Sequence, residues 1–501
     1  MHTNLPTKAP RRTTIVVAVV AALVVVAGSV IAISSVFAAP TTPTPTITSG
    51  PANPTNATAA SFTFTDSASG ATFECALDGD AFAACVSPKT YPGPLANGVH
   101  TFSVRANKTN ATVSSVASLT WRVDTVAPAL VSINRAGANP ASVGPLSFTV
   151  TFAEPVTGLA LSNLGVITSG ISGSAPSLTS VAPVGSAPSA TWTANVATTG
   201  TTAVNGTIGL NLTSNASVKD AAGNPLAGSL PVAGQVYGYD TTKPTISTLN
   251  RADANPTNSG SLHWTATFSE TVANVVGANF GLSTSGFTGT APSISSVTPV
   301  GSAPTSAWTV TVATSGAGAA HGTIRLDLTA KGTIQDAAAN ALQAAVPAAG
   351  QTYDYDSVSP AVTLTKVNGN TAAFPLSTTA NLTSFGGACG IAAGDSPSVY
   401  VSITGAAIQS AVVPCTASAT WSYSTAPTLS ATGTYRVTAT QPDTAGNTGS
   451  SGERTVVIDR TPPPAAIFTN TPEASTDKTN AQFNWYDTEG GVNYQCALDG
   501  A

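Results

Sequence analysis

Charged residues are scarce in this chain, and their scarcity excludes one class of partner. Of 501 residues, 18 are Lys or Arg and 23 are Asp or Glu, which is 8%, whereas soluble domains average about 25%. The net charge is −5 at pH 7, and no long run of basic residues occurs. Nucleic-acid binding requires clustered Lys and Arg, so we expect no nucleic-acid partner. Uncharged Thr, Ser, Asn, Gly and Ala must cover most of the surface.

The sequence also lacks the short motifs of common active sites. It has no His-Glu-x-x-His zinc motif, no Cys-x-x-Cys pair and no Gly-x-Ser-x-Gly nucleophile elbow. The histidines are scattered: His100 precedes a strand, His263 lies on the polar face of another expected strand, and His321 adjoins Gly322. We therefore expect a protein that is not an enzyme. We expect no bound cofactor either, with calcium left open below.

Cysteine is rare too, since five residues are too few for a small scaffold built on disulfides. Cys75 and Cys85 share one segment, and Cys389 and Cys415 share another, so we predict two local disulfides. Cys496 is left over. Residues 483–501 match the segment from Phe62 onward at a constant offset of 421, which aligns Cys496 with Cys75. We therefore expect the chain to stop inside a domain, as a fragment of a longer protein.

No acidic residue occurs before Asp66, and the N-terminus has the pattern of an export segment. Lys8, Arg11 and Arg12 precede an apolar run, Ile15–Ile33, and small residues follow it. Two interpretations stay open. One is a signal cleaved after Ala38; the other is a retained membrane anchor, because the run almost spans a bilayer. In both, the rest of the chain lies outside the cell, and the closely spaced prolines of residues 40–45 form a short extended stalk.

The most informative feature is an internal repeat without a gap. Residues 134–244 fall on 250–360 when shifted by 116 positions. The shift superimposes Asn134–Pro140 on Asn250–Pro256 and Trp192 on Trp308. A repeat of this length predicts a string of similar domains rather than one enzyme body. The matched tryptophans lie in alternating stretches, so we expect them in the core rather than on a carbohydrate-binding surface.

The repeats read as β-strands. Apolar residues alternate with polar ones in 146–152 and 262–268, and again in 308–312 and 324–328. Such alternation, interrupted by Gly, Pro, Asn and Ser, predicts half-buried antiparallel strands in two-sheet sandwiches. Four aspartates that each close an apolar stretch are followed four residues later by proline: Asp124, Asp240, Asp356 and Asp459. Because proline cannot continue a ladder, we place domain boundaries there.

The expected organisation is all-β, with tandem immunoglobulin-like (Ig-like) sandwiches after an N-terminal hydrophobic helix. The segments are an export signal or anchor (1–39), a Thr/Pro stalk (40–45), a sandwich with a cysteine pair (46–127), two repeats (128–243 and 244–359), a second sandwich with a cysteine pair (360–462) and a truncated sandwich (463–501).

Three groups of residues resemble the bacterial Ig-like repeats of large surface proteins and adhesins. Phe152–Val156, Asp220–Asn224 and Tyr239–Pro244 look like one branch. Gly433–Thr440, followed by Asp443–Asn447, looks like another. The first domain, with Phe73–Gly79 and Gly98–Ala106, is similar to a cysteine-paired relative. The resemblance covers the chain after residue 46. It implies Ig-like architecture and a role as a stalk, adhesin or accessory module, among which fold alone does not choose.

The Asp-x-x-Gly-Asn element has two interpretations. It occurs at 220–224 and 443–447, and as Asp336–Asn340 with alanine in place of glycine. It fits a turn, in which Asp binds its own backbone and Gly or Asn accepts a positive φ. It also fits calcium binding, because carboxylates suit a hard cation and recur at the same repeat positions. The expected ligands would be Glu154, Asp220 and Asp240 in one copy and Glu270, Asp336 and Asp356 in the next.

The function that we expect is that of a non-catalytic, exported surface protein whose domains form a semi-rigid spacer or stalk. Its partners would be neighbouring domains of the same chain and, if the N-terminal segment is uncleaved, the membrane. Two alternatives remain. The chain is an adhesin that binds a cell-surface protein or glycan through sandwich loops, or it carries accessory repeats of an exported enzyme whose catalytic domain follows residue 501.

Overall fold

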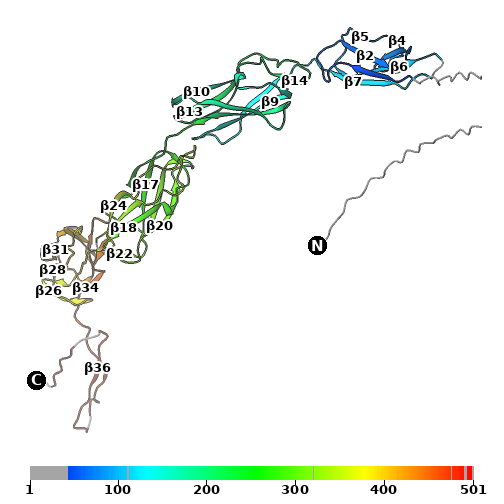
Figure 1. Ribbon diagram of the computed structural model, residues 1–501. Helices are drawn as coiled ribbons and strands as arrows, with labels where there is room; N and C mark the ends of the chain where they lie inside the picture. The colour runs from blue at the N-terminus through cyan, green and yellow to red at the C-terminus, as the bar shows by residue number, and fades with distance from the viewer. Residues whose placement is uncertain (1–42, 110–111, 320, 476, 490–492, 499–501) are drawn as a thin grey trace, which may run out of the picture. The chain divides into compact units, whose positions relative to one another are not determined.

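The computed structural model describes residues 43–109, 112–319, 321–475, 477–489 and 493–498 (Figure 1). The expected export or anchor helix Ile15–Ile33 lies outside these residues. The described part is all-β, as predicted, with two 3-10 turns, η1 (Leu161–Asn163) and η2 (Gly277–Asn279), and no α-helix. No helix in this part is long and apolar enough to cross a membrane.

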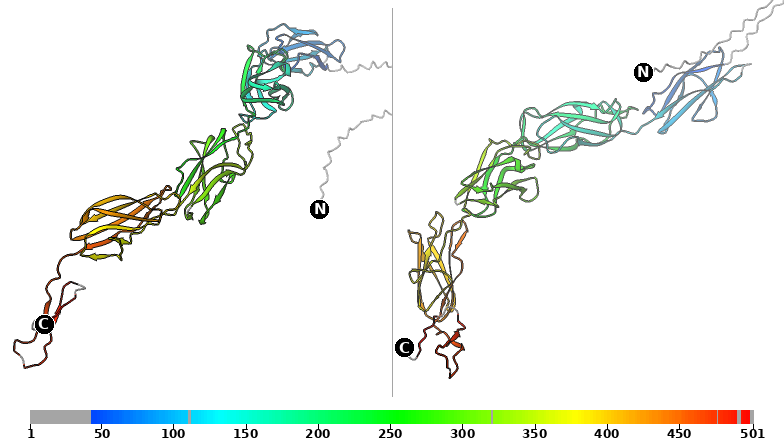
Figure 2. Two further views of the ribbon diagram at one scale, coloured as in Figure 1. Left: turned by 90° about the vertical axis from the view of Figure 1, so that its left-hand side faces the viewer. Right: turned by 90° about the horizontal axis from the view of Figure 1, so that it is seen from below.

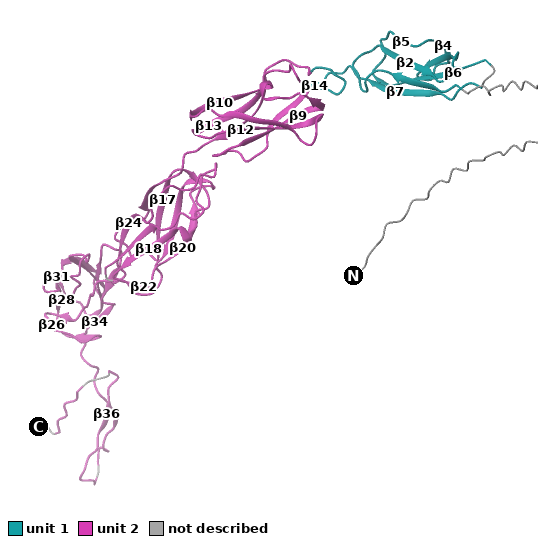
Figure 3. Cartoon of the chain, in the orientation of Figure 1, with its two compact units in different colours: residues 1–127, 219–225 teal, residues 128–218, 226–501 magenta. Residues whose placement is uncertain are grey.

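The chain divides into two compact units (Figure 3). Unit 1 comprises residues 1–127 and 219–225, and unit 2 comprises residues 128–218 and 226–501. Unit 1 contains two antiparallel sheets. The first has the order β1 (Pro45–Ser49), β2 (Ala60–Asp66) and β5 (Lys89–Tyr91). The second has the order β4 (Ala83–Cys85), β3 (Thr72–Leu77), β6 (Gly98–Asn107) and β7 (Ala117–Val123). The short strand β14 (Lys219–Asp220) also belongs to unit 1.

Unit 1 illustrates how a chain poor in charge builds a sandwich. Along β6 the side chains alternate, so that Phe102 and Val104 are fully buried between the sheets. On the opposite face, Thr101 and Ser103 form hydroxyl hydrogen bonds of 3.3 and 3.0 Å with Thr120 and Ser118 of β7. Such cross-strand pairs stabilise a sheet without ionised groups.

In unit 2 the first sandwich has two sheets. One pairs β8 (Leu130–Arg135) with β9 (Leu146–Thr157), β9 with β12 (Ser189–Ala197), and β12 with β11 (Ser177–Pro183). The other has the order β10 (Leu164–Gly173), β13 (Thr201–Leu212) and β15 (Val232–Tyr239).

The second sandwich repeats this plan. One sheet has the order β16 (Ile246–Arg251), β17 (Ser261–Val272), β21 (Thr305–Ala313) and β20 (Ser293–Pro299), and the other has β18 (Phe280–Ser285), β23 (Gly322–Leu328) and β24 (Ala348–Tyr355). A two-stranded ladder joins β19 (Thr288–Gly289) to β22 (Ala317–Gly318). The ranges of β20, β21 and β24 equal those of β11, β12 and β15 plus 116 residues, which confirms that the repeats have equivalent strands.

A tyrosine marks the same position in both repeats. The hydroxyl of Tyr237 accepts hydrogen bonds from the backbone N–H groups of Ala136 and Gly137 at 3.1 and 2.7 Å, and donates to the carbonyl oxygen of Ser147 at 2.8 Å. Tyr353 makes the equivalent three bonds in the second repeat. Both side chains are almost fully buried, so each polar tip is satisfied while its ring packs in the core.

The third sandwich of unit 2 differs in its strand order. One sheet has β26 (Asn370–Thr371), β25 (Lys366–Val367), β28 (Leu382–Ala388) and β31 (Thr420–Leu429). The other has β27 (Leu376–Thr378), β34 (Arg454–Ile458), β32 (Gly433–Pro442), β29 (Ser398–Gly405) and β30 (Gln409–Pro414), with β33 (Thr448–Ser450) paired to β32. The hairpin of β35 (Ile467–Asn470) and β36 (Asn484–Tyr486) follows.

Four separate hydrophobic cores lie between the paired layers of strands seen in Figure 2. Their buried members fall within residues 60–123, 133–239, 249–355 and 362–458. Trp192 and Trp308 are members of the second and third cores, each 5% exposed, so the prediction that they are core residues is confirmed. Both disulfides are also present, Cys75–Cys85 and Cys389–Cys415, and Cys496 is a free, exposed thiol.

Candidate functional site: the joints between sandwiches

The four aspartates that close the sandwiches, named here the closing aspartates, share one backbone environment. The backbone N–H of each closing aspartate donates to a backbone carbonyl oxygen near the beginning of the same domain, at 2.8–3.0 Å. The pairs are Asp124 with Thr55, Asp240 with Ala141, Asp356 with Thr257 and Asp459 with Thr378. That segment runs parallel to the last strand in each case. The end of every sandwich is therefore tied to its beginning.

The side chains of the closing aspartates shape the residues that follow. In each, Oδ1 accepts a hydrogen bond from the N–H two residues later, at 2.8–3.1 Å, given by Val126, Thr242, Val358 and Thr461. This is an Asx turn, a local structure that orders the backbone. The same bond from Thr461 is the main cause of the lowered pKa of the Asp459 carboxyl. The residues between each closing aspartate and its proline therefore begin in a defined turn.

Three Asp-x-x-x-Asn segments, named here the Asp–Asn turns, contact the closing aspartates. They are residues 220–224, 336–340 and 443–447. In each, the backbone N–H of the asparagine donates to Oδ1 of the aspartate, and the asparagine Nδ2 donates to Oδ2, with all six distances between 2.7 and 2.8 Å. The Asp–Asn turns are mostly buried, with Asp336 6% and Asn340 9% exposed. Turn formation is as the sequence predicts.

The sequence did not predict what the second amide proton of each asparagine does. Asn340 Nδ2 also donates to the backbone carbonyl oxygen of the closing residue Asp240 at 2.8 Å, and Asn447 Nδ2 donates to that of Asp356 at 2.9 Å. In unit 1, Asn224 makes the same bond to Asp124 at 2.8 Å. A primary amide has two donors, and both are used. Each of these three closing aspartates is thus held through its N–H by its own domain and through its carbonyl by an Asp–Asn turn.

Further contacts differ between the two joints of unit 2. Beside the joint of Asp240, the N–H of Gln343 donates to the carbonyl of Pro244 at 2.8 Å, and both residues belong to the second repeat. At the joint of Asp356, Asn258 Nδ2 donates to Asn447 Oδ1 at 2.8 Å. Gly394, on a loop of the next sandwich, lies against Thr444 and His321. The bond between Asn258 and Asn447 therefore joins two sandwiches at the joint of Asp356.

One Asp–Asn turn contains a residue in an unfavourable backbone conformation. The position before the asparagine has a positive φ in all three, 94° at Gly223, 66° at Ala339 and 98° at Gly446. A side chain in this left-handed region costs about 1–2 kcal/mol, partly offset by the greater freedom of glycine in the unfolded chain.

We expect Ala339→Gly to raise the free energy of unfolding by about 0.5–1 kcal/mol, measured by urea denaturation.

The reciprocal change provides the control for this prediction. Gly446→Ala places the same methyl group in the same conformation, and we expect it to lower the free energy of unfolding by a similar amount. Equal, neutral effects of both substitutions would show that the left-handed position is not strained.

The expected calcium ligands are distributed differently from the sets that the repeat suggested. One carboxylate oxygen each of Asp240, Glu270 and Asp336 lies within 4.8 Å of the other two. Asp240 comes from the end of one sandwich, and the other two come from the next. Asp220 serves in its own Asp–Asn turn in unit 1. Asp356 lies 3.9 Å from His321 Nδ1, and Glu154 is half-buried in β9. None of these last three belongs to the group.

The electrostatics of the Asp240–Glu270–Asp336 group are unfavourable for three free carboxylates. Burial, followed by the negative charges of Asp336 and Asp240, raises the pKa of the Glu270 carboxyl. Glu270 Oε1 is shielded from solvent and has no hydrogen-bond partner. The group lines a cavity of about 220 Å³, together with Pro140 and Asn205 of the preceding sandwich. An ionised carboxylate without a donor is costly to bury.

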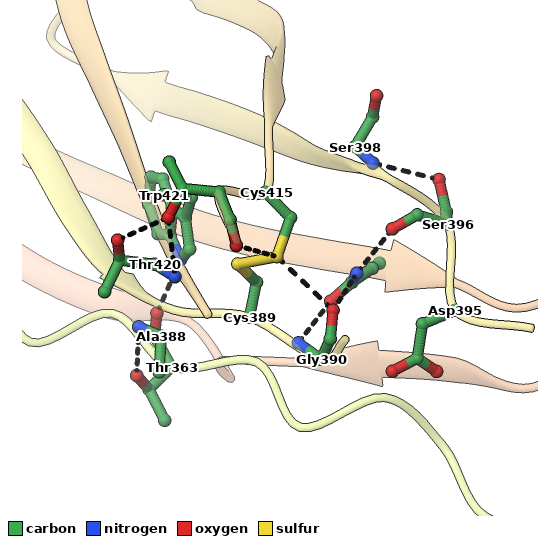
Figure 4. Close-up of a disulfide and its surroundings, with 12 residues drawn as sticks. Thr363, Ala388, Cys389, Gly390, Asp395, Ser396, Ser398, Cys415, Thr420 and Trp421 are labelled. Atoms are coloured by element: carbon green, nitrogen blue, oxygen red, sulfur yellow. Dashed lines mark hydrogen bonds between the residues drawn. A yellow bond between two sulfur atoms is a disulfide. The ribbon is translucent and has the colours of Figure 1, made fainter. Parts of the chain in front are cut away.

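The disulfide Cys389–Cys415 supports the loop that borders the joint of Asp356 (Figure 4). The fully buried Gln441 holds the same loop. Its Nε2 donates to the carbonyls of Gly390 and Ser396 at 2.8 and 2.6 Å, and its Oε1 accepts from the N–H of Gly390 at 2.8 Å. The loop in turn accepts a bond from Thr444 N–H to Gly394 O at 2.9 Å. The disulfide is therefore linked to the third Asp–Asn turn through one loop.

We expect the double substitution Cys389→Ser and Cys415→Ser to lower the free energy of unfolding of this sandwich by about 3.5 kcal/mol. That value follows from the chain-entropy relation for the sequence separation of 26 residues. Denaturation monitored through Trp421, which lies next to the disulfide in Figure 4, measures it. Cys496→Ser is the control, because that thiol is exposed and unpaired, and it should leave stability unchanged.

Comparisons with known proteins give a general likeness only. No family model matches the chain, and no curated protein matches it. Among solved structures, the chain is similar to the FN1–FN3 domains of chicken CNTN1 (10% identity, 66% of this chain and 99% of that chain, TM-score 0.18). It is also similar to dimeric latent PorU from Porphyromonas gingivalis (12% identity, 68% and 35%, TM-score 0.16). The alpha-2-macroglobulin of Escherichia coli is another similar structure (12% identity, 86% and 45%, TM-score 0.16). At such scores function must be inferred from this chain's own residues.

Proposed function

We propose that the chain is a non-catalytic, exported modular protein whose sandwiches form a semi-rigid spacer at the cell surface. The observation that carries the proposal is the repeated attachment of the closing aspartates. At Asp240 and Asp356, the N–H is bound by one sandwich and the carbonyl oxygen by an asparagine of the next. A linker of four residues would otherwise permit wide reorientation.

The strength of these attachments is consistent with a spacer that bends but does not swing freely. A net hydrogen bond contributes about 0.5–1.5 kcal/mol. At both joints the Asx turn and the asparagine bond act together, and at Asp356 the bond from Asn258 to Asn447 adds to them. Contacts between domains of one chain permit relative motion unless the interface is large and apolar. Several bonds of this size restrict the joint without locking it.

Export is supported by the two disulfides, because disulfides persist in oxidising compartments outside the cytosol. The basic and then apolar N-terminal segment supports it independently. The adhesin alternative expects aromatic side chains clustered on exposed loops. Among the described residues, the exposed aromatic side chains are Tyr400, which lies in strand β29, and four in the C-terminal segment, Phe468, Phe483, Tyr486 and Tyr494. Phe483 and Tyr494 align at the offset of 421 with Phe62 and Phe73, which pack in the core of the first sandwich, so we assign this group to the core of a further sandwich. The spacer is therefore the function that we favour.

A change in the number of repeats tests the proposal in cells. Excision of residues 244–359 joins Lys243 to Pro360, which is the repeat equivalent of Pro244, because the repeat has no gap. Duplication of the same segment lengthens the chain by one sandwich. We expect the accessibility of a C-terminal epitope to bead-coupled antibody on intact cells to fall on excision and to rise on duplication. Accessibility that is independent of repeat number would contradict a spacer. An epitope protected from antibody until the cells are opened would contradict export.

A further inference from the structure

A buried histidine in unit 1 has a hydrogen-bond acceptor at each of its ring nitrogens. His100, on β6, is 8% exposed, and its ring lies beside the indole of Trp121 with the centroids 5.5 Å apart. Its Nδ1 lies 2.7 Å from Oδ2 of Asp78, and its Nε2 lies 2.8 Å from the carbonyl oxygen of Ala96. A neutral imidazole carries one N–H and can donate to only one of these oxygens. The two contacts together therefore require the doubly protonated imidazolium.

The surroundings of Asp78 favour its ionised form. Its Oδ1 accepts a hydrogen bond from the backbone N–H of Thr101 at 2.8 Å, and such a bond stabilises the carboxylate rather than the carboxylic acid. The proton between the two side chains therefore stays on the imidazole. The bond to the carbonyl of Ala96, followed by the bond to Asp78, raises the pKa of the His100 imidazole, while burial opposes the shift.

The other charged side chains around β6 are directed elsewhere. Alternation along the strands places Arg105 of β6 and Arg122 of β7 on the outer face of their sheet, whereas His100 is on the inner face. Arg105 pairs there with Glu74 at 2.8 Å. Among the described residues of unit 1, the charge that affects the pKa of His100 is that of Asp78. The remaining titratable groups on the neighbouring elements are Asp66 at the end of β2, Asp80 after β3, Lys89 and Tyr91 on β5, and Asp124 after β7.

The loop that His100 holds also anchors the residues that follow the last strand of unit 1. Asn97, next to Ala96, accepts hydrogen bonds at Oδ1 from both the N–H and the hydroxyl of Thr125, each at 2.9 Å. Thr125 directly follows the closing aspartate Asp124. A continuous set of contacts therefore runs from the histidine, through its loop, to the segment after Asp124.

We propose that His100 is a proton-dependent clamp. Its imidazolium joins the turn at Asp78 to the loop at Ala96. Loss of one proton to water leaves one of these two acceptors without a donor, so the loop loosens and the anchor of Thr125 weakens with it. The proposal goes beyond the spacer function, because the clamp would respond to pH whether or not the chain acts as a spacer.

The direction of the response follows from the protonation states of the folded and unfolded chain. An unperturbed imidazole has a pKa of about 6.5, and the folded protein raises that of His100. The stabilisation is therefore fully present below about pH 6.5 and is lost as the pH rises through the folded-state pKa. The clamp holds in mildly acidic medium and releases in alkaline medium.

Titration of the imidazole carbons tests the proposal in the full chain. The sequence contains four histidines, so NMR spectra of protein labelled with 13C-histidine assign the His100 resonance once His2→Gln, His263→Gln and His321→Gln have assigned the others. We expect His100 to titrate with a pKa above the ordinary value of about 6.5. Asp78→Asn should move its midpoint to lower pH, because the amide lacks the negative charge. A midpoint at or below the ordinary value in the parent would overturn the proposal.

Hydrogen exchange at the Thr125 amide measures the consequence for the segment after Asp124. Protection is expressed relative to an unstructured peptide at the same pH, which removes the intrinsic effect of pH on exchange. In the parent we expect protection to fall about tenfold between about pH 6 and pH 9, the factor that corresponds to one hydrogen bond from a charged group. In His100→Gln the protection should not change with pH, and in Asp78→Asn, which keeps the ring, the fall should begin at lower pH.

His263→Gln is the matched control for exchange. Nδ1 of His263 lies 3.0 Å from Oδ2 of Asp253 on an exposed surface, and a neutral imidazole can supply that single donor. This variant should therefore retain the fall in protection at Thr125. Protection that is independent of pH in the parent, or that falls equally in His100→Gln, would overturn the proposal.

Discussion

Replacement of Trp264 by alanine is expected to lower the free energy of unfolding of its sandwich by about 3–5 kcal/mol. The side chain is fully buried on β17, and its ring meets the ring of Tyr353 edge-on at 4.7 Å. Its Nε1 donates to the carbonyl of Gln351 at 2.9 Å. Alanine removes the packing, leaves a cavity and deprives a backbone acceptor of its donor. Urea denaturation followed by circular dichroism measures the loss.

The internal repeat provides the matched control. Phe148 occupies the equivalent position in the preceding sandwich, where it packs against Tyr237 in the same edge-on manner at 5.2 Å. Trp264→Phe should therefore be tolerated far better than Trp264→Ala, and should lose chiefly the bond to Gln351. Equal losses for the two substitutions would show that the repeats are not equivalent in their packing.

Replacement of Asn340 by alanine is expected to cost about 2–4 kcal/mol, because it leaves two buried acceptors without a donor at about 1–3 kcal/mol each. The two acceptors are the carbonyl of Asp240 and Oδ2 of Asp336. Since one acceptor belongs to the preceding sandwich, the substitution should loosen the joint as well as the turn. Hydrogen exchange should become faster at the Gln343 amide, which is bonded to Pro244, the first residue of the same sandwich after the joint.

Asn250→Ala is the control for the joint, since Asn250 is exposed on a strand of the same sandwich and contributes nothing to the turn. It should leave both stability and exchange at Gln343 unchanged. Faster exchange at Gln343 in both variants would indicate a general loss of stability rather than a loosened joint.

Much of the fold could be predicted from the sequence because its signals are local. Apolar and polar residues alternate along Leu146–Phe152 and along its repeat equivalent, and this alternation predicts which face of each strand is buried. In the structure the apolar side chains of these strands are buried as predicted. The disulfides followed from cysteines within one domain. The Asp–Asn turn followed from the residue types alone.

The joints could not be predicted because they depend on contacts between domains. The repeat shows only which positions correspond within one copy, so the predicted calcium ligands Asp240, Glu154 and Asp220 were all taken from the same copy. In the structure Asp240 meets Glu270 and Asp336, which lie in the next copy. The second bond of Asn340 was missed for the same reason, since its acceptor is 100 residues earlier in the chain. The positive φ of Ala339 could not be predicted, because residues other than glycine rarely adopt this conformation and alanine gives no indication of it.

A spacer requires that these joints hold consecutive sandwiches within a narrow range of relative orientations, and a distance distribution between two sandwiches measures that range. Spin labels at Val143→Cys and Ile408→Cys, two exposed positions of unit 2, would be introduced in a Cys496→Ser background. Double electron–electron resonance should show one narrow distance distribution that broadens in the Asn340→Ala, Asn447→Ala double variant. A broad distribution in the parent protein, left unchanged by the loss of both asparagines, would show that the joints are flexible and that the asparagine bonds do not restrain them.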